Sequence, residues 1–391
     1  MTDVCPPVDD LKLFSVGRMS YEDLERIATH LAACVACENR LDELHRTSEA
    51  STDDLIAALR APTDAEPFSQ EDCREIVASI TDLVARRIDG QRRETEPVAG
   101  TLIGGCRLEE PLAYGSFGTV YRAVDLDSSE LRAVKVLSQF RFSDARIAAR
   151  FDREAELLLA LEHPNIVKVF RGGRQDGMPF LVMELIDGVS LSALMRFVGT
   201  VDLPEACQLV CQAALALQYA SAKSVIHRDI KPSNIMLTST GEVRVLDFGL
   251  AVMTLDVPLS ERLTASGQVL GTPDYIAPEQ IKDSRQADVR SDLYSLGCVF
   301  YELLSGKPPF RDQRSTLGKL RAHRQDPPVP IEIAASSIPA EIATLIGKLL
   351  EKDPGDRPPT PDEIISVLQP WLSKSDLLAL VQRCRKPAAG S

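Results

Sequence analysis

The order of the patterns after about residue 100 most constrains the fold of this chain. Short β-branched runs come first, namely LRAVKVL (131–137), NIVKVF (165–170), FLVMEL (180–185) and EVRVLDF (242–248). Long segments with apolar residues at three- and four-residue steps lie between and after them, and this spacing is typical of helices. Strands that come first, with helices dominating later, predict a two-layer α+β fold rather than a regular alternation of strand and helix.

The first 100 residues have a different pattern. Two amphipathic helices are predicted, at Tyr21 to His45 and at about Gln70 to Ile88, followed by the polar, charged segment DGQRRETEPVAG. We therefore divide the chain into a helical domain at 1–47, a linker with one helix at 48–100, the α+β unit at 101–372 and a C-terminal tail at 373–391.

Charge and hydropathy exclude several classes of protein. The chain has 44 basic and 57 acidic residues, a net charge of -13, and residues 1–100 hold 11 basic and 21 acidic side chains. This imbalance argues against nonspecific nucleic-acid binding. No apolar run reaches the roughly 18 residues of a membrane helix, and the N-terminus does not look like a secretion signal. We expect a cytoplasmic protein without a membrane span, whose nine cysteines stay reduced or bind metal.

Two features near residue 120 can serve a phosphate ligand. The segment LAYGSFGTV (112–120) carries Gly115 and Gly118, whose backbone can approach a phosphate, with Phe117 at the tip. An ordinary glycine-containing hairpin is the alternative, and the P-loop pattern is absent. Lys135 lies in an apolar strand, where its ammonium needs an anionic partner such as Glu154. A lysine that reaches solvent at a sheet edge is the alternative.

Three later motifs supply the groups that phosphoryl transfer needs. The segment HRDIKPSN (227–234) places a carboxylate, an ammonium and an amide within a few residues, DFG (247–249) adds a second carboxylate, and APE (277–279) follows. One carboxylate can orient a hydroxyl nucleophile, an Asp/Asn pair can hold Mg²⁺, and a cation can offset charge on the moving phosphoryl group.

This motif set resembles the protein kinase superfamily over roughly residues 101–372. The segments HPNIV, VMELIDG, HRDIKPSNIM and GTPDYIAPEQ are most similar to bacterial serine/threonine kinases of the eukaryote-like type. The resemblance implies a bilobal fold, with a β-rich N-lobe, a helical C-lobe and ATP in the cleft. It also implies residue roles: Asp229 as the catalytic carboxylate, Lys231 at the γ-phosphate, Lys135 at the α/β-phosphates and held by Glu154, and Asn234 and Asp247 as Mg²⁺ ligands.

The resemblance further implies a nucleotide site and two structural contacts that hold the site in place. The nucleotide-site residues are Leu112, Ala113, Tyr114, Gly115, Ser116, Phe117, Gly118, Val120, Ala133, Lys135, Met183, Glu184 and Leu185. Ala113 stands where the family has the first glycine of its loop, and we expect a small effect on nucleotide affinity. Asp292 is expected to brace the catalytic loop, and Arg357 to pair with Glu279.

We therefore predict a Mg²⁺- and ATP-dependent kinase that phosphorylates Ser or Thr hydroxyls of proteins, including its own. A pseudokinase scaffold is the rival interpretation, but every motif residue that the chemistry needs is present. Lys231 and Thr272 follow the serine/threonine pattern rather than the tyrosine pattern. Thr264 and Ser266 are predicted sites of activating autophosphorylation, because a phosphate there could pair with Arg228. Solvated loop hydroxyls without a regulatory role are the alternative.

The N-terminal domain carries a candidate zinc site. His30, Cys34 and Cys37 share one face of the predicted helix, and Cys5 can supply a fourth ligand. Small buried cysteines with a surface histidine are the alternative, and a thioredoxin-like motif is disfavoured because no strand precedes it. Residues 5–46 resemble the zinc-binding helical domains of anti-sigma factors. That resemblance implies a protein-interaction module with an unknown protein partner, and an anti-sigma-like regulatory role as an alternative function. A homodimer is one candidate assembly of the chain.

Overall fold

A computed structural model describes the following residues: 5–7, 30, 34, 37, 97–115, 118–137, 145–248, 273–283, 286–313, 315–335 and 338–385. The chain divides into two compact units, one of residues 1–98 with 260–268 and one of residues 99–259 with 269–391. Only His30, Cys34 and Cys37 of the predicted helix Tyr21 to His45 are described, and the predicted helix Gln70 to Ile88 lies wholly outside the described residues. The fold described below is therefore that of the second unit.

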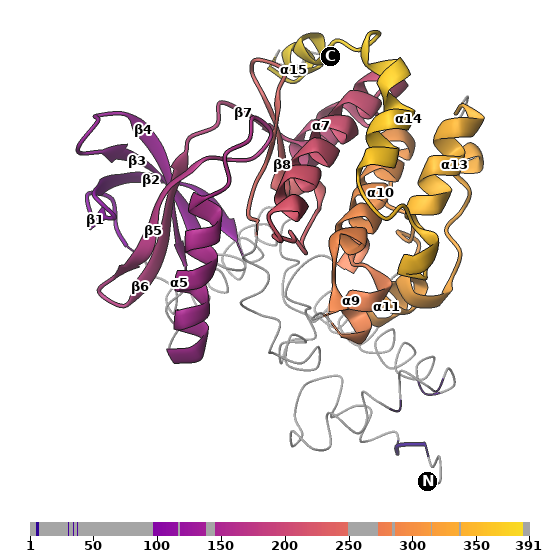
Figure 1. The fold of residues 1–391 in the computed structure, drawn as a ribbon, viewed down its shortest axis with the longest axis horizontal. Coiled ribbons are helices and arrows are strands. Elements are labelled where there is room, and N and C mark those ends of the chain that lie inside the picture. Colours follow the sequence, from indigo (N-terminus) through magenta and orange to yellow (C-terminus); the bar gives the residue numbers. More distant parts are fainter. Residues whose placement is uncertain are drawn as a thin grey trace, which may run out of the picture. The chain divides into compact units, whose positions relative to one another are not determined.

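The β-rich lobe is built on one antiparallel sheet, seen on the left of Figure 1. Its order is β1-β2-β3-β4-β6-β5. The strands are β1 (Leu102–Ile103), β2 (Cys106–Gly115), β3 (Gly118–Asp125), β4 (Leu131–Leu137), β5 (Val169–Gln175) and β6 (Met178–Glu184).

Alternation along the strands gives this sheet two different faces. Val134 and Val136 of β4 pack in an apolar cluster with Phe180 and Val182 of β6. The residues between them face the other way: in the register Ala133 pairs with Met183 and Lys135 with Leu181. Because successive side chains of a strand point to opposite faces, Lys135 lies on the same face as Ala133.

Helix α5 (Ala145–Leu159) packs on β5 and β6 of this sheet. Phe151, Ala155 and Leu158 are its buried contacts. Glu154, the predicted partner of Lys135, lies within this helix, whose last residue is Leu159.

A second, smaller antiparallel sheet joins the two lobes, with the order β7-β8-β9. Its strands are β7 (Gly188–Ser190), β8 (Ile235–Thr238) and β9 (Val243–Val245). The segment HRDIKPSN runs directly into β8 through the 3-10 turn η2 (Pro232–Asn234), and DFG directly follows β9. This sheet therefore brings the two motif segments together.

The helical lobe surrounds α10, whose buried residues lie on every side of the helix. Its neighbours include α7 and α13. The helices are α6 (Leu191–Val198), α7 (Leu203–Ala222), α9 (Pro278–Lys282), α10 (Val289–Ser305), α11 (Thr316–Gln325), α12 (Ile331–Ala334), α13 (Ala340–Leu349), α14 (Asp362–Leu372) and α15 (Leu377–Arg385), with short 3-10 turns η4 (Pro273–Tyr275) and η6 (Pro354–Asp356).

Helix α15 lies inside the segment that sequence analysis treats as a tail. Leu377, Leu380 and Val381 are buried, and the helix packs against α6 and α7. Among the described residues, no single helix meets the length and apolarity of a membrane span, although α14 and α15 meet them jointly across a bend of 84°.

Two of the four predicted strands are confirmed nearly in full, and the other two are shorter than predicted. LRAVKVL coincides with β4, and FLVMEL lies almost wholly in β6. The prediction of a strand over all of NIVKVF is wrong, because β5 begins only at Val169. Ile166 instead forms an isolated parallel bridge with Val245, so its burial comes from contact with the second sheet. Within EVRVLDF only Val243–Val245 is a strand.

Candidate active site

Strand β4 and the segment after β9 bring two opposite charges into contact. The Lys135 Nζ atom lies 2.7 Å from Asp247 Oδ1, and the lysine side chain is only 6% exposed, against 27% for the aspartate. Burial acts to raise the pKa of the Asp247 carboxyl, but Lys135 above all, with His227 and Lys231, holds that pKa below its ordinary value. Asp247 is therefore an anion at neutral pH, and its remaining exposure leaves it open to a ligand.

A second cluster forms around Asp229. Its Oδ2 atom accepts hydrogen bonds from Lys231 Nζ at 2.7 Å and from Asn234 Nδ2 at 3.1 Å. The same Asn234 amide donates to the Asp229 carbonyl at 2.9 Å, which fixes the amide orientation. Since the amide nitrogen serves Asp229, the Asn234 oxygen is the atom available to a cation. A carboxylate, an ammonium and an amide oxygen thus meet at one place.

Asp292 of α10 holds the backbone just before Asp229. The backbone N–H groups of His227 and Arg228 donate to its two carboxylate oxygens at 2.8 and 2.7 Å. Burial raises the pKa of Asp292, and these donors offset part of that effect. The predicted role of Asp292 as a brace of this loop is confirmed.

His227 links the loop to the segment that carries Asp247. Its Nε2 atom lies 2.6 Å from the Leu246 carbonyl, while Nδ1 accepts from the Asp229 backbone N–H at 3.2 Å. Nε2 thus lies against a carbonyl oxygen and Nδ1 against a backbone N–H. The ring also packs on Phe248, with 4.6 Å between the ring centroids. Asp229 and Asp247 are therefore positioned by one shared side chain.

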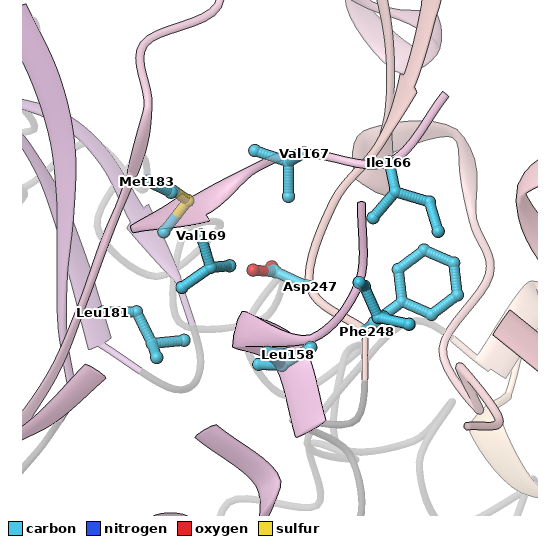
Figure 2. A pocket seen from close by; sticks show the side chains of 9 residues that line it. Leu158, Ile166, Val167, Val169, Leu181, Met183, Asp247 and Phe248 are labelled. Carbon is cyan, nitrogen blue, oxygen red and sulfur yellow. The ribbon is translucent and has the colours of Figure 1, made fainter. Parts of the chain in front are cut away.

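An apolar pocket lies behind Asp247, between β5, β6 and α5. Its lining consists of Leu158, Leu161, Ile166, Val167, Val169, Leu181, Met183, Asp247 and Phe248. Figure 2 shows Val169, Leu181 and Met183 on one side and Ile166 and Phe248 on the other, with the Asp247 carboxylate between them. Asp247 is the only charged group in this lining, so the pocket lowers the local dielectric around its carboxylate.

The described residues of the predicted nucleotide site lie on β2, β3, β4 and β6, except Leu185, which directly follows β6. Val120 pairs with Lys135 in the β3–β4 register, and Ala133 pairs with Met183 in β4–β6, so these four share one face. Ala113, Leu112 and Tyr114 of β2 are exposed, and Glu184 and Leu185 are half-buried at the end of β6.

Gly118 is needed where β3 begins. Its φ is +149°, and a Cβ atom there would lie 2.0 Å from the Val136 carbonyl oxygen, so no other residue fits without moving β4. Gly115 pairs with Gly118 across the hairpin, and Ser116 and Phe117 at its tip lie outside the described residues.

The predicted pair of Arg357 and Glu279 is confirmed as a two-point contact. Arg357 Nη1 and Nη2 each lie 2.8 Å from a different Glu279 oxygen, and the Arg357 side chain is 0% exposed. Burial acts to raise the pKa of Glu279, but the hydrogen bonds from Arg357 hold it below its ordinary value. The pair ties α9 to the segment after α13.

Two sets of predicted residues stay predictions. Glu154 is half-buried in α5, and its pairing with Lys135 is not tested, because the contact seen for Lys135 is the one to Asp247. Thr264 and Ser266 lie outside the described residues, as does Thr272.

In the first unit, the four predicted zinc ligands converge. Cys5, His30, Cys34 and Cys37 each offer a sulfur or nitrogen atom, and these atoms lie within 4.8 Å of one another. The Sγ atoms of Cys5 and Cys34 are 3.8 Å apart, and His30 Nε2 is buried without a hydrogen-bond partner among the described residues. A backbone hydrogen bond from Cys37 lowers the pKa of the Cys34 thiol to about 7, whereas burial raises that of Cys37 to about 12.

Comparison with known proteins agrees with this geometry. The family model of the protein kinase domain matches residues 107–372. The serine/threonine-protein kinase PknB of Mycobacterium tuberculosis is 37% identical over 261 residues, which cover 66% of this chain and 41% of PknB. PknA of the same species is 37% identical over 265 residues, which cover 66% of this chain and 59% of PknA. The chain thus matches only about half of the length of these relatives.

Solved structures show the same fold. The crystal structure of the Mycobacterium tuberculosis PknI kinase domain has a TM-score of 0.57 and 25% sequence identity, and covers 71% of this chain and 100% of that domain. The chain belongs to the protein kinase family. The predicted α+β architecture, with a β-rich N-lobe and a helical C-lobe, is confirmed.

Sequence reasoning missed one polar residue at this site. Gln280 of α9 donates from Nε2 to the Arg228 carbonyl at 2.9 Å. It stands next to the APE motif in the sequence, but nothing in its spacing indicates contact with a loop 52 residues earlier.

Proposed function

We propose that this protein is a serine/threonine protein kinase that transfers the γ-phosphoryl group of ATP to protein hydroxyls, including its own. The observation that carries the proposal is the convergence of Lys135 with Asp247 and of Lys231 and Asn234 with Asp229. The serine/threonine kinases PknB and PknA, to which the chain is similar, support the choice of acceptor.

The residues present suit the nucleotide and its metal. Asp247 offers an anionic oxygen and Asn234 an amide oxygen, and Mg²⁺ prefers such oxygen ligands. Magnesium, when bound with ATP, neutralises charge on the β- and γ-phosphate oxygens. Lys135 supplies a buried cation for the α- and β-phosphates, on the sheet face shared with Val120 and Ala133. Glu154 is the proposed second partner that holds Lys135.

The proposed reaction is an in-line displacement. The substrate hydroxyl oxygen forms a bond to the γ-phosphorus, the bond from that phosphorus to the bridging oxygen breaks, and ADP leaves. Asp229 accepts the hydroxyl proton, and its orientation is set by Asn234 and by the braced backbone before it. Lys231 lies 2.7 Å from the Asp229 carboxylate, which places its ammonium beside the reacting hydroxyl. From there its positive charge offsets negative charge on the transferring phosphoryl group.

Phosphoamino-acid analysis tests this proposal. Purified protein is incubated with magnesium and γ-labelled ATP, with a general protein acceptor. We expect label on phosphoserine and phosphothreonine, and loss of transfer by at least about a hundredfold in Lys135→Met, since one preorganised charge contributes on that order. Lys168→Met is the matched control, because Lys168 pairs with Glu162 at the surface. If the chain is a pseudokinase, reactions with wild type, Lys135→Met and Lys168→Met should all give no labelled phosphoserine or phosphothreonine.

We further propose that Cys5, His30, Cys34 and Cys37 bind one structural zinc ion. Tetrahedral zinc with Zn–S bonds of about 2.3 Å places two sulfur atoms roughly 3.8 Å apart. The Cys5–Cys34 separation of 3.8 Å has this value, whereas a disulfide needs about 2.05 Å. A buried His30 nitrogen without a described partner also fits a metal ligand, because such an atom is costly to bury unsatisfied.

Metal analysis tests the zinc proposal. Protein purified without a metal-affinity tag should contain about one zinc per chain, in keeping with a single four-ligand site. The double variant Cys34→Ala/Cys37→Ala should lose it. Cys207→Ala/Cys211→Ala is the matched control, since those two thiols are buried in α7 and are not among the four converging residues, and it should keep its zinc. Equal zinc content in both double variants would refute the site.

Regulation by autophosphorylation at Thr264 or Ser266 is proposed from the motif, because Arg228 directly precedes Asp229. A phosphate nearby would supply two negative charges to that arginine. Mass spectrometry after incubation with magnesium and ATP should find the modification, and Thr264→Ala/Ser266→Ala should be slower than wild type. A double variant as fast as wild type would remove this switch. The N-terminal domain, by its resemblance, is proposed to bind a protein partner.

A further inference from the structure

The residue before the catalytic carboxylate has an unfavourable backbone conformation. Arg228 has φ of +65°, in the left-handed region that is unfavourable for a residue with a Cβ atom. Such a conformation persists only where the surroundings fix it. Asp229 follows directly, so the direction of its carboxylate depends on this strained peptide.

Both peptide groups of Arg228 are held by side chains. Its N–H donates to Asp292 Oδ1 at 2.7 Å, and its carbonyl accepts from Gln280 Nε2 at 2.9 Å. Asp292 comes from the central helix α10, whereas Gln280 comes from α9, directly after the APE motif. The strained residue is therefore clamped from two elements.

Gln280 is itself rigidly placed. Its side chain is buried, at 8% exposure, and its Oε1 atom accepts from the Ala277 backbone N–H at 3.1 Å. The neighbouring Glu279 is fixed by Arg357, so the backbone of α9 at this point cannot shift freely. One amide thus joins the start of α9 at Ala277, through its oxygen, to the loop before Asp229, through its nitrogen.

We propose that Gln280 is a positioning residue for phosphoryl transfer, which holds Arg228 in its left-handed conformation and so aims Asp229. The inference rests on the proposed kinase function. It also links α9 to the loop before Asp229, because a displacement of α9 breaks the hydrogen bond that Gln280 Nε2 donates to the Arg228 carbonyl. The position of α9 therefore affects the direction of the Asp229 carboxylate.

The chemistry of the amide distinguishes positioning from packing. Gln280→Met keeps the length and volume of the side chain but removes both hydrogen bonds. Gln280→Glu keeps the acceptor for Ala277 but sets a carboxylate oxygen against the Arg228 carbonyl. Gln218→Met is the matched control, because Gln218 donates to Asp362 between α7 and α14, away from the catalytic loop.

Two measurements are made on each full-length variant. Steady-state kinetics separates kcat from the KM for ATP, and amide hydrogen exchange follows the peptide that contains Arg228 and Asp229. We expect kcat to fall roughly three- to tenfold in Gln280→Met, the effect of one net hydrogen bond, with the KM for ATP within about twofold. Gln280→Glu should lose at least as much. Exchange in the catalytic loop should rise by a similar factor. Gln218→Met should change neither quantity.

The outcomes separate this inference from the kinase proposal. If kcat and loop exchange in both Gln280 variants match wild type within about twofold, the inference is overturned. A fall in thermal stability with unchanged loop exchange and unchanged kcat of the folded protein also overturns it. If wild type transfers no phosphate but loop exchange still rises in Gln280→Met, the kinase proposal fails while the clamp on Arg228 stands.

Discussion

Loss of the Arg357 guanidinium should destabilise the helical lobe more than loss of any surface ion pair. Arg357 pairs at two points with Glu279 and also donates to the carbonyls of Glu351, Arg290 and Lys352 at 2.7, 3.0 and 3.0 Å. Its side chain is 0% exposed, against 10% for Glu279. Arg357→Met keeps most of the volume and removes every one of these donors.

The expected magnitude follows from the charge that is left behind. Removing one partner of a buried ion pair costs about 3–5 kcal/mol, because the other charge stays buried without compensation. For a domain of this size each kcal/mol lowers the midpoint of thermal unfolding by about 2–4 °C, so the expected fall is roughly 10 °C.

Thermal unfolding followed by circular dichroism measures the effect. The matched control is Lys348→Met, because Lys348 also lies 2.8 Å from a carboxylate, that of Glu363, but the two side chains are 52% and 38% exposed. An exposed pair contributes about 0–1 kcal/mol, so this variant should stay within about 4 °C of wild type. Equal shifts in the two variants would contradict the assignment of Arg357 as a buried anchor.

Three further outcomes are expected. Gly118→Ala should raise the KM for ATP by roughly tenfold in steady-state kinetics, because its Cβ would lie 2.0 Å from the Val136 oxygen and must displace β4. An unchanged KM would show that the β2–β3 hairpin accepts a side chain at this position without affecting ATP binding. Asp292→Ala should lower the free energy of unfolding in urea by about 3–6 kcal/mol, because two backbone donors lose a charged acceptor. The Glu279 pKa is held below its ordinary value of 4.5, so its ion pair stabilises fully above that pH and the contribution disappears as pH falls through the lower folded-state pKa. Urea unfolding at falling pH should show this loss in wild type and less of it in Arg357→Met.

The sequence made it possible to predict which polar side chains of the site lie together when those residues are close in the chain. Asp229, Lys231 and Asn234 lie within six residues, so their grouping follows from any compact loop, and the structure joins them by hydrogen bonds. The bracing by Asp292 and the pair of Arg357 with Glu279 span long distances in the sequence, and they were predictable only through the resemblance of their motifs to a known family.

Other features depend on tertiary contacts that no periodicity encodes. The run NIVKVF predicted a strand, but Ile166 is buried and bridges Val245 instead of lying in a strand of the large sheet. The left-handed conformation of Arg228 and its contact with Gln280 arise only when α9 meets the catalytic loop. Helix α15 was missed because its nine residues are too few for a clear pattern, and packing on α6 and α7 stabilises it.

The most direct test of the central claim compares wild type with Asp229→Asn for transfer of label from γ-labelled ATP to a serine/threonine peptide, with nucleotide affinity measured on the same samples. The substitution keeps the size of the side chain and its contact with Asn234 while removing the carboxylate that we propose accepts the hydroxyl proton. The account predicts that transfer falls by at least about a hundredfold, the lower range for a general base, while the affinity for Mg-ATP stays within about threefold of wild type. Transfer by Asp229→Asn at the wild-type rate would contradict the assignment of this loop as the catalytic centre.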